Sequence, residues 1–145
     1  MRPTILPALL LTATALPAFA QGDIDNGEKA FRKCQACHVV RDDNGDVLAG
    51  RNARTGPNLY GVIGRVAGTE PDFRNYSAPM REAGEAGLIW TKKDFVAFLQ
   101  DPTVFLQTYL DDNKARSKMA FKTRSEDEAR DLFAFIESFA PTQAN

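Results

Sequence analysis

Apolar residues recur at helical spacing in several parts of the chain. Near the start, four positions three or four residues apart predict an amphipathic helix from about residue 25 to the first cysteine: Ile24, Gly27, Phe31 and Cys34. Further helices are predicted where a capping residue precedes an apolar segment. They begin after Ser77, after Thr91, at Asp101-Pro102 and after Ser125, and the last two end near Tyr109 and before Pro141.

Turn-forming residues dominate the segment between the first two predicted helices. Asn44-Gly45 predicts a tight turn between Val39-Val40 and Val47-Leu48. Glycines and Pro57 then predict loops through most of residues 50–70. The pattern as a whole indicates an all-α domain of four or five helices with long loops. Such a chain is too irregular to pack well without a large apolar group at its centre.

Residues 1–20 have the pattern of an export signal. A short positive start at Met1-Arg2 is followed by an apolar stretch, and Ala18-Phe19-Ala20 fits the small-x-small cleavage pattern. The stretch is shorter than a membrane-spanning segment and contains Pro7 and Pro17. We therefore expect a cleaved signal peptide at 1–20, with cleavage after Ala20, and one exported domain at 21–145.

Composition narrows the class of protein further. The chain has 145 residues, 43% of them apolar and 26% charged, which is typical of a single globular domain. Without Arg2, 17 basic residues remain against 19 acidic ones. A nucleic-acid-binding protein would normally be clearly basic, so we expect no nucleic-acid partner. No long apolar run follows residue 20, so we expect no membrane insertion.

The two cysteines and the one histidine of the chain lie together in Cys34-Gln35-Ala36-Cys37-His38. A structural zinc site would need a fourth ligand from elsewhere. A thioredoxin-like dithiol would need βαβ units, which the pattern does not predict. A disulfide between Cys34 and Cys37 would close a very small loop and restrain little of the unfolded chain. Covalent haem attachment fits best, with two thioether bonds and His38 as the proximal iron ligand.

A sixth iron ligand must come from another residue type, since the chain has no second histidine. Once Met1 is removed, Met80 and Met119 are the candidates. Met80 falls in the short helix capped by Ser77, where core packing is its expected role. Met119 lies in a polar, loop-like stretch, where an apolar side chain needs something to bury against. We therefore predict Met119 as the distal ligand.

These motifs resemble those of class I c-type cytochromes, and specifically the bacterial cytochrome c2 subtype. The resemblance covers essentially all of residues 21–145, and the loops before Pro57 and before Met119 are long, as in that subtype. The matching residues, in order, are Gly27, Phe31, Cys34, Cys37, His38, Thr55-Gly56-Pro57-Asn58-Leu59, Gly64-Arg65, Tyr76, Trp90, Lys118-Met119 and Phe121.

The resemblance implies the class I cytochrome c fold wrapped around one covalently bound haem c. It implies that the backbone carbonyl of Pro57 accepts a hydrogen bond from the His38 ring and so orients it. It also implies that Arg65, Tyr76 and Trp90 surround the haem propionates. Finally, it implies that Gly27 and Phe31 form the contact of the first helix with the last one, at Leu132 and Phe135.

One position departs from the family's pattern. Phe98 stands where many relatives have a tyrosine whose hydroxyl reaches the methionine sulfur. That hydrogen bond is absent here, so a redox potential cannot be transferred from any relative.

With His38 and Met119 on the iron, no position remains for a substrate. The resemblance therefore implies a monomeric, soluble periplasmic one-electron carrier and not an enzyme. It would take electrons from the cytochrome bc1 complex and pass them to a photosynthetic reaction centre or a terminal cytochrome oxidase. The alternative is a haem enzyme or gas sensor with an open iron position, peroxidase-like for example. A protein with a Cys34–Cys37 disulfide and no haem is a third, redox-inert possibility.

A run of basic residues flanks the predicted distal ligand. No acidic residue occurs between 113 and 125. Together with Lys33, beside Cys34, this run is expected to form a basic rim around the haem edge that steers the protein to an acidic partner, although a solvated loop is the common role of such a run. The acidic residues, Glu128 among them, are expected to lie elsewhere. The basic rim consists of Lys33, Lys114, Arg116, Lys118 and Lys122.

Overall fold

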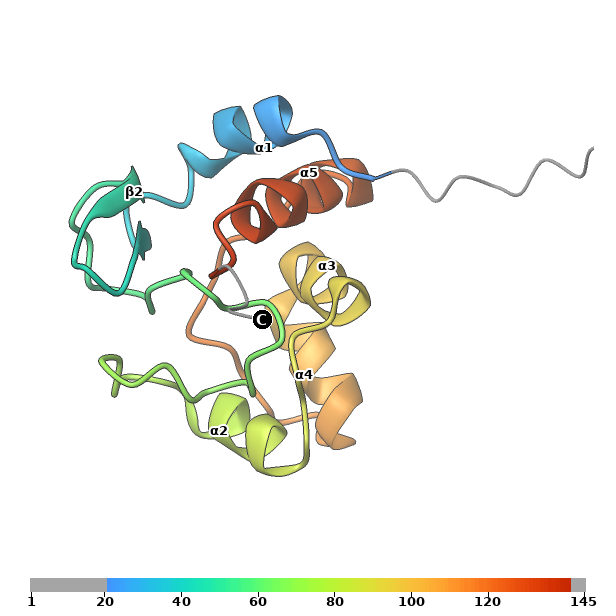
Figure 1. Cartoon of the computed structure of the whole chain (residues 1–145). Coiled ribbons are helices and arrows are strands. Elements are labelled where there is room, and N and C mark those ends of the chain that lie inside the picture. The colour runs from blue at the N-terminus through green and yellow to red at the C-terminus, as the bar shows by residue number, and fades with distance from the viewer. Residues whose placement is uncertain (1–20, 142–145) are drawn as a thin grey trace, which may run out of the picture.

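The computed structural model describes residues 21–141. The predicted signal peptide and its cleavage site after Ala20 lie outside the described residues. The expected all-α class is confirmed, with five helices in the described part of the chain (Figure 1). They are α1 (Ile24–Phe31), α2 (Ala78–Glu85), α3 (Lys92–Gln100), α4 (Pro102–Leu110) and α5 (Glu126–Glu137). Within 21–141, no helix is long and apolar enough to cross a membrane.

The predicted caps are confirmed at the helix starts. Ser77, Thr91 and Asp101 each accept a hydrogen bond from a backbone N–H in the first turn of the helix that follows. The first helix is shorter than predicted. It ends at Phe31, and the cysteine motif continues as a series of turns, not as helix.

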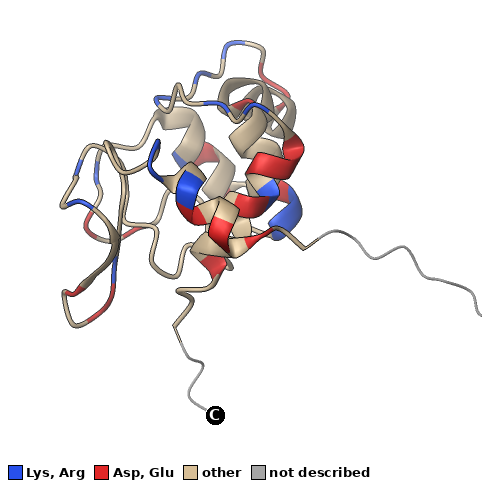
Figure 2. Ribbon diagram, turned by 90° about the horizontal axis from the view of Figure 1, so that it is seen from above, with Lys and Arg blue, Asp and Glu red and all other residues tan. Residues whose placement is uncertain are grey.

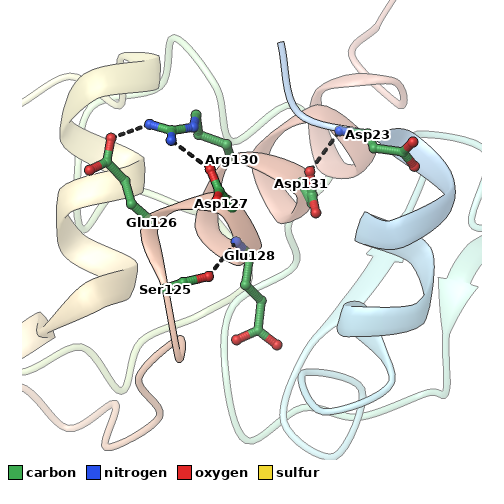
Figure 3. Close-up of polar contacts among 7 residues, drawn as sticks. All are labelled: Asp23, Ser125, Glu126, Asp127, Glu128, Arg130 and Asp131. Atoms are coloured by element: carbon green, nitrogen blue, oxygen red, sulfur yellow. Dashed lines mark hydrogen bonds and ion pairs between the residues drawn. The ribbon is translucent and has the colours of Figure 1, made fainter. Parts of the chain in front are cut away.

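The start of α5 differs in detail from a capping box. Ser125 Oγ accepts from the backbone N–H of Glu128 at 3.2 Å, as expected (Figure 3). The Glu128 carboxylate, however, accepts from the N–H of Arg124 at 2.7 Å and not from that of Ser125. Three acidic residues occupy the first turn, where they stabilise the positive end of the helix dipole.

A two-stranded antiparallel sheet follows the cysteine motif, formed by β1 (Val39–Arg41) and β2 (Val47–Gly50). Its turn lies one position earlier than predicted. The backbone N–H of Gly45 donates to the Asp42 carbonyl at 3.1 Å, so Asp43 and Asn44 are the central residues. Gly45 follows with a φ of 91°, in the left-handed region that favours glycine.

The first and last helices cross directly (Figure 1). A Cβ at Gly27 would lie 2.1 Å from the carbonyl oxygen of Asp131, so only glycine permits this approach. The rings of Phe31 and Phe135 are 5.3 Å apart beside it. The Asp131 carboxylate also accepts from the backbone N–H of Asp23 at 2.7 Å, which ties the start of α1 to α5 (Figure 3). The predicted contact between these helices is confirmed.

A cluster of aromatic side chains surrounds Trp90, with members on α3 and α4. Trp90 is buried and lies 5.0 Å from the ring of Phe98 and 6.0 Å from that of Phe95, both on α3. Phe105 of α4 lies 6.1 Å from Trp90 on another side. Helix α3 also packs against α5, and α2 packs against α4, so the five helices enclose a central space from several directions.

Candidate functional site

The central space is a cavity of about 470 Å³. This volume is within the range of small-molecule and cofactor sites. Most of its lining is apolar or aromatic. It brings together every residue predicted to contact the haem: Cys34, Cys37, His38, Pro57, Arg65, Tyr76, Trp90 and Met119. Two residues of the basic rim, Lys33 and Lys118, also line it.

The cysteine motif is held as a compact turn. The backbone N–H groups of Cys37 and His38 both donate to the Cys34 carbonyl, at 3.0 and 2.9 Å. Cys34 and Cys37 are free cysteines that line the same cavity. Burial, with a smaller contribution from the Glu128 charge, raises the pKa of the Cys34 thiol to about 11.

The His38 ring has one nitrogen engaged by the backbone. Its Nδ1 lies 2.9 Å from the carbonyl oxygen of Pro57. A carbonyl oxygen can only accept, so Nδ1 carries the hydrogen and Nε2 is left as the nitrogen with a lone pair. Burial lowers the pKa of His38, against a smaller opposing effect of the Pro57 hydrogen bond. A neutral imidazole is the form that binds a metal ion.

Gly56 makes this arrangement possible, a role that the sequence analysis did not assign to it. A Cβ there would lie 2.5 Å from Cε1 and 2.7 Å from Nδ1 of the His38 ring. The backbone N–H of Gly56 also donates to the Cys37 carbonyl at 2.7 Å. The chain therefore passes flat against the ring before it reaches Pro57. The only sequence signal for this close approach was a glycine immediately before the proline.

Three polar or aromatic residues predicted near the propionates lie around another part of the cavity. Arg65 donates to the Tyr60 carbonyl at 2.5 Å and to the Asn58 carbonyl at 3.5 Å, which fixes its guanidinium beside the cavity. Trp90 is joined to Arg65 through the backbone, with its N–H 3.0 Å from the Arg65 carbonyl. Tyr76 is half-buried, and its ring meets that of Phe73 edge-on at 4.8 Å.

Both candidate methionines line the cavity, but from different kinds of structure. Met80 is buried within α2, and its backbone N–H donates to Ser77 Oγ, as the predicted short helix requires. Met119 lies in the loop between α4 and α5, half-buried, with its N–H donating to Ser117 Oγ at 3.0 Å. The choice of Met119 as iron ligand stays a prediction.

Phe98 is 6% exposed and also lines the cavity. Its ring packs edge-on against Trp90 and Phe105. The position is therefore an apolar part of the site and offers no side-chain hydroxyl.

The expectation that acidic residues lie away from the basic rim is wrong at two positions. Lys33 forms an ion pair with Glu128, and Lys122 Nζ lies 2.5 Å from Asp101 Oδ2. Glu128 is 95 positions from Lys33 along the chain, so no local pattern could have found this contact. Figure 2 likewise shows basic and acidic segments interspersed over the helices and loops. Among the described residues, the rim is partly neutralised by the chain itself.

The residues around the cavity fit a covalently bound haem. Two thiols three residues apart, an adjacent imidazole with its Nδ1 hydrogen-bonded, and a thioether sulfur in one apolar cavity are the donor set of a c-type cytochrome. The aromatic walls supply the apolar contacts that a porphyrin needs.

Comparison with known proteins agrees with this assignment. No family model matches the chain. Cytochrome c2 of Cereibacter sphaeroides is 52% identical over 134 residues, covering 92% of each chain. Cytochrome c-551 of Roseobacter denitrificans is 51% identical, covering 95% of this chain and 96% of that protein. The X-ray structure of cytochrome c2 from Rhodobacter sphaeroides superposes with a TM-score of 0.79 and covers 81% of this chain and 95% of the other.

Similarity of this extent concerns the whole domain and not one motif. The relatives are cytochromes c2, c-551 and c-550, which are electron carriers and not enzymes. Since identity exceeds half over nearly the full length of cytochrome c2, and the folds superpose, the chain belongs to the class I c-type cytochromes of the cytochrome c2 group, which carry one covalently bound haem c.

Proposed function

We propose that the protein is a soluble periplasmic electron carrier whose haem iron is held by His38 and Met119. It takes electrons from the cytochrome bc1 complex and passes them to a photosynthetic reaction centre or a terminal oxidase. The observation that carries the ligand assignment is the single cavity that gathers both thiols, the hydrogen-bonded imidazole and Met119. The mature domain begins at Gln21 and acts as a monomer.

The haem, when bound, supplies one centre that gains and loses a single electron. Cys34 and Cys37 hold it through thioether bonds. His38 would coordinate the iron through Nε2, and the Pro57 carbonyl, which accepts from Nδ1, fixes the orientation of the ring and would increase its basicity. Met119 would supply its thioether sulfur as the second protein ligand of the iron, so that no ligand position would remain for a substrate. Methionine ligation and an apolar cavity both favour the reduced state.

Side chains around the cavity complete the site. The aromatic walls formed by Trp90, Phe95 and Phe98 exclude water from the redox centre. Arg65, Tyr76 and Trp90 line the same cavity and would hold the propionates with their N–H and O–H groups. Electrons enter and leave where the basic rim meets the cavity, at Lys33 and Lys118.

Ligand exchange distinguishes Met119 from Met80. Met119→Ala is expected to keep the covalent haem but to lose the methionine-to-iron charge-transfer band, lower the potential and allow cyanide or CO to bind. Met80→Ala is the matched control because Met80 lines the same cavity but belongs to α2. It is expected to cost about 2–5 kcal/mol of stability and to keep the band. The opposite pair of spectra would make Met80 the ligand.

Docking at the basic rim is tested by charge reversal. Lys118→Glu and Lys33→Glu are expected to slow electron transfer to a partner several-fold at low ionic strength, with the potential nearly unchanged. The slowing should fade as salt shortens the screening length to about 10 Å. Rates that do not depend on ionic strength would remove the basic rim from the mechanism.

A further inference from the structure

Two carboxylates of the chain form ion pairs with lysines of the basic rim. Asp101 Oδ2 lies 2.5 Å from Nζ of Lys122, and Glu128 Oε1 is ion-paired with Lys33. The lysine side chains are 54% and 40% exposed, whereas those of Asp101 and Glu128 are 31% and 16% exposed. In each pair the acid is the more buried partner and the lysine faces solvent.

Each acid is fixed in place by the backbone through its other oxygen. Asp101 is the N-cap of α4, and its Oδ1 accepts from the Val104 N–H at 3.1 Å. Glu128 Oε2 accepts from the Arg124 N–H at 2.7 Å. The carboxylates therefore stay where they are, while the flexible lysine stems can turn toward another acid.

Both acids are ionised at neutral pH. The Lys122 ammonium, followed by the Val104 N–H, lowers the pKa of Asp101. The Arg124 N–H, followed by Lys33, lowers the pKa of Glu128. A partner that offers carboxylates to these lysines therefore meets lysines that already have a fixed negative neighbour.

We propose that Asp101 and Glu128 are specificity-determining residues for docking: each competes with the partner's carboxylates for one rim lysine and so sets how acidic a surface must be to capture the protein. This inference rests on the proposed docking role of the basic rim. Weakly acidic surfaces cannot displace the internal carboxylates. A redox protein with closely spaced carboxylates can share or take over Lys33 and Lys122.

Neutral isosteres test the proposal without disturbing the fold. Glu128→Gln and Asp101→Asn keep a side-chain oxygen that can accept from the backbone N–H of Arg124 or Val104, and asparagine is a good N-cap. The assay measures the second-order rate at which flash-oxidised, purified photosynthetic reaction centres oxidise the reduced cytochrome. At about 10 mM ionic strength, where screening extends to roughly 30 Å, each variant is expected to react about two- to fivefold faster.

Glu126→Gln is the matched control for net charge. Glu126 is on the same helix and pairs with Arg130, and it does not line the cavity (Figure 3). It removes the same charge as Glu128→Gln, so any general effect of net charge appears in both. Glu128→Gln is expected to exceed this control at low salt and to approach it at 200 mM ionic strength.

A double-mutant cycle gives the decisive outcome. Lys33→Gln is expected to slow the reaction more in the Glu128→Gln background than in the wild type, because only there is Lys33 fully available to the partner. Equal effects in both backgrounds, or Glu128→Gln matching Glu126→Gln, would overturn the proposal while leaving the basic rim intact. If Lys33→Gln and Lys118→Gln both leave the rate unchanged, the docking role itself is wrong, and this inference with it.

Discussion

The two sides of the cavity are built differently. On the side of His38, main-chain hydrogen bonds hold the neighbouring segments: Gly56 N–H to the Cys37 carbonyl at 2.7 Å and Leu59 N–H to the Val39 carbonyl at 2.9 Å. The ring itself is hydrogen-bonded through Nδ1 to the backbone carbonyl of Pro57. The imidazole is thus held by groups that cannot move without moving the chain.

On the side of Met119, the loop is fixed mainly by hydrogen bonds that involve side chains. Ser117 N–H donates to Thr103 Oγ1 at 3.2 Å, and Met119 N–H donates to Ser117 Oγ. Lys118 Nζ reaches across to Asn75, 2.7 Å from its Oδ1. These groups are half-buried or exposed, so water competes for the same hydrogen bonds. The difference indicates that His38 and Met119, the two proposed iron ligands, are held unequally, and that the methionine is the one expected to dissociate first.

The largest loss of stability is expected when the close contact around His38 is disrupted. Gly56→Ala places a Cβ 2.5 Å from the His38 ring, so the ring must shift away from Pro57. We expect a loss of about 3 kcal/mol in unfolding free energy, measured with guanidinium on the haem-containing protein. Gly45→Ala is the control because nothing lies within 4 Å of its added Cβ. Its left-handed φ alone should cost about 1 kcal/mol, and equal losses would contradict the close contact at Gly56.

A smaller effect is expected from a substitution on the Met119 side of the cavity. Asn75→Ala removes the side-chain acceptor of Lys118 beside Met119 and leaves only the Asn75 backbone carbonyl, 3.1 Å from Lys118 Nζ. We expect the methionine band of the ferric protein to be lost at a pH about half to one unit lower, since one hydrogen bond to a charged group is removed. The absorbance titration of Asn44→Ala, in the distant hairpin turn, should match that of the wild type. An unshifted midpoint for Asn75→Ala would mean that this bond does not hold the loop.

Phe98→Tyr tests the same side from within the cavity. A hydroxyl that donates to the Met119 sulfur would withdraw electron density and weaken its bond to ferric iron. The potential should rise modestly, and high pH should displace Met119 more easily. Both are read by a redox titration and a pH titration of the variant beside the wild type. No change in either would show that a hydroxyl at this position does not reach the sulfur.

The sequence predicts local features of this molecule well, because their causes are local. Ser77, Thr91 and Asp101 cap helices through residues three positions away, and the cysteine motif spans five positions. Contacts between distant segments escape such reasoning. The pairing of Glu128 with Lys33 and the passage of Gly56 under His38 exist only once the chain has folded. The hairpin turn was displaced because Asp42, and not Asn44-Gly45 alone, organises it through its carbonyl and carboxylate.

The smallest expected effect concerns two glutamates with opposite pH behaviour. Glu70 is 7% exposed, in the same loop as Asn75, and burial raises its pKa above 4.5 against a smaller opposing effect of Arg65. The folded protein therefore keeps this proton to a higher pH than the unfolded chain does. Its contribution to stability declines as the pH rises from 4.5 through the folded-state pKa and is constant above it.

Glu128 behaves in the other sense because the Arg124 N–H and Lys33 lower its pKa. Its stabilising contribution is present above pH 4.5 and is lost as the pH falls through the lowered folded-state pKa. Unfolding free energies measured from pH 3 to 7 should thus show Glu70→Gln gaining on the wild type as the pH rises, and Glu128→Gln falling behind it. Parallel curves of unfolding free energy against pH for Glu70→Gln and the wild type would mean that ionising the buried carboxyl does not destabilise the folded protein. The lower stability of the Met119 side would then come only from its exposed hydrogen bonds.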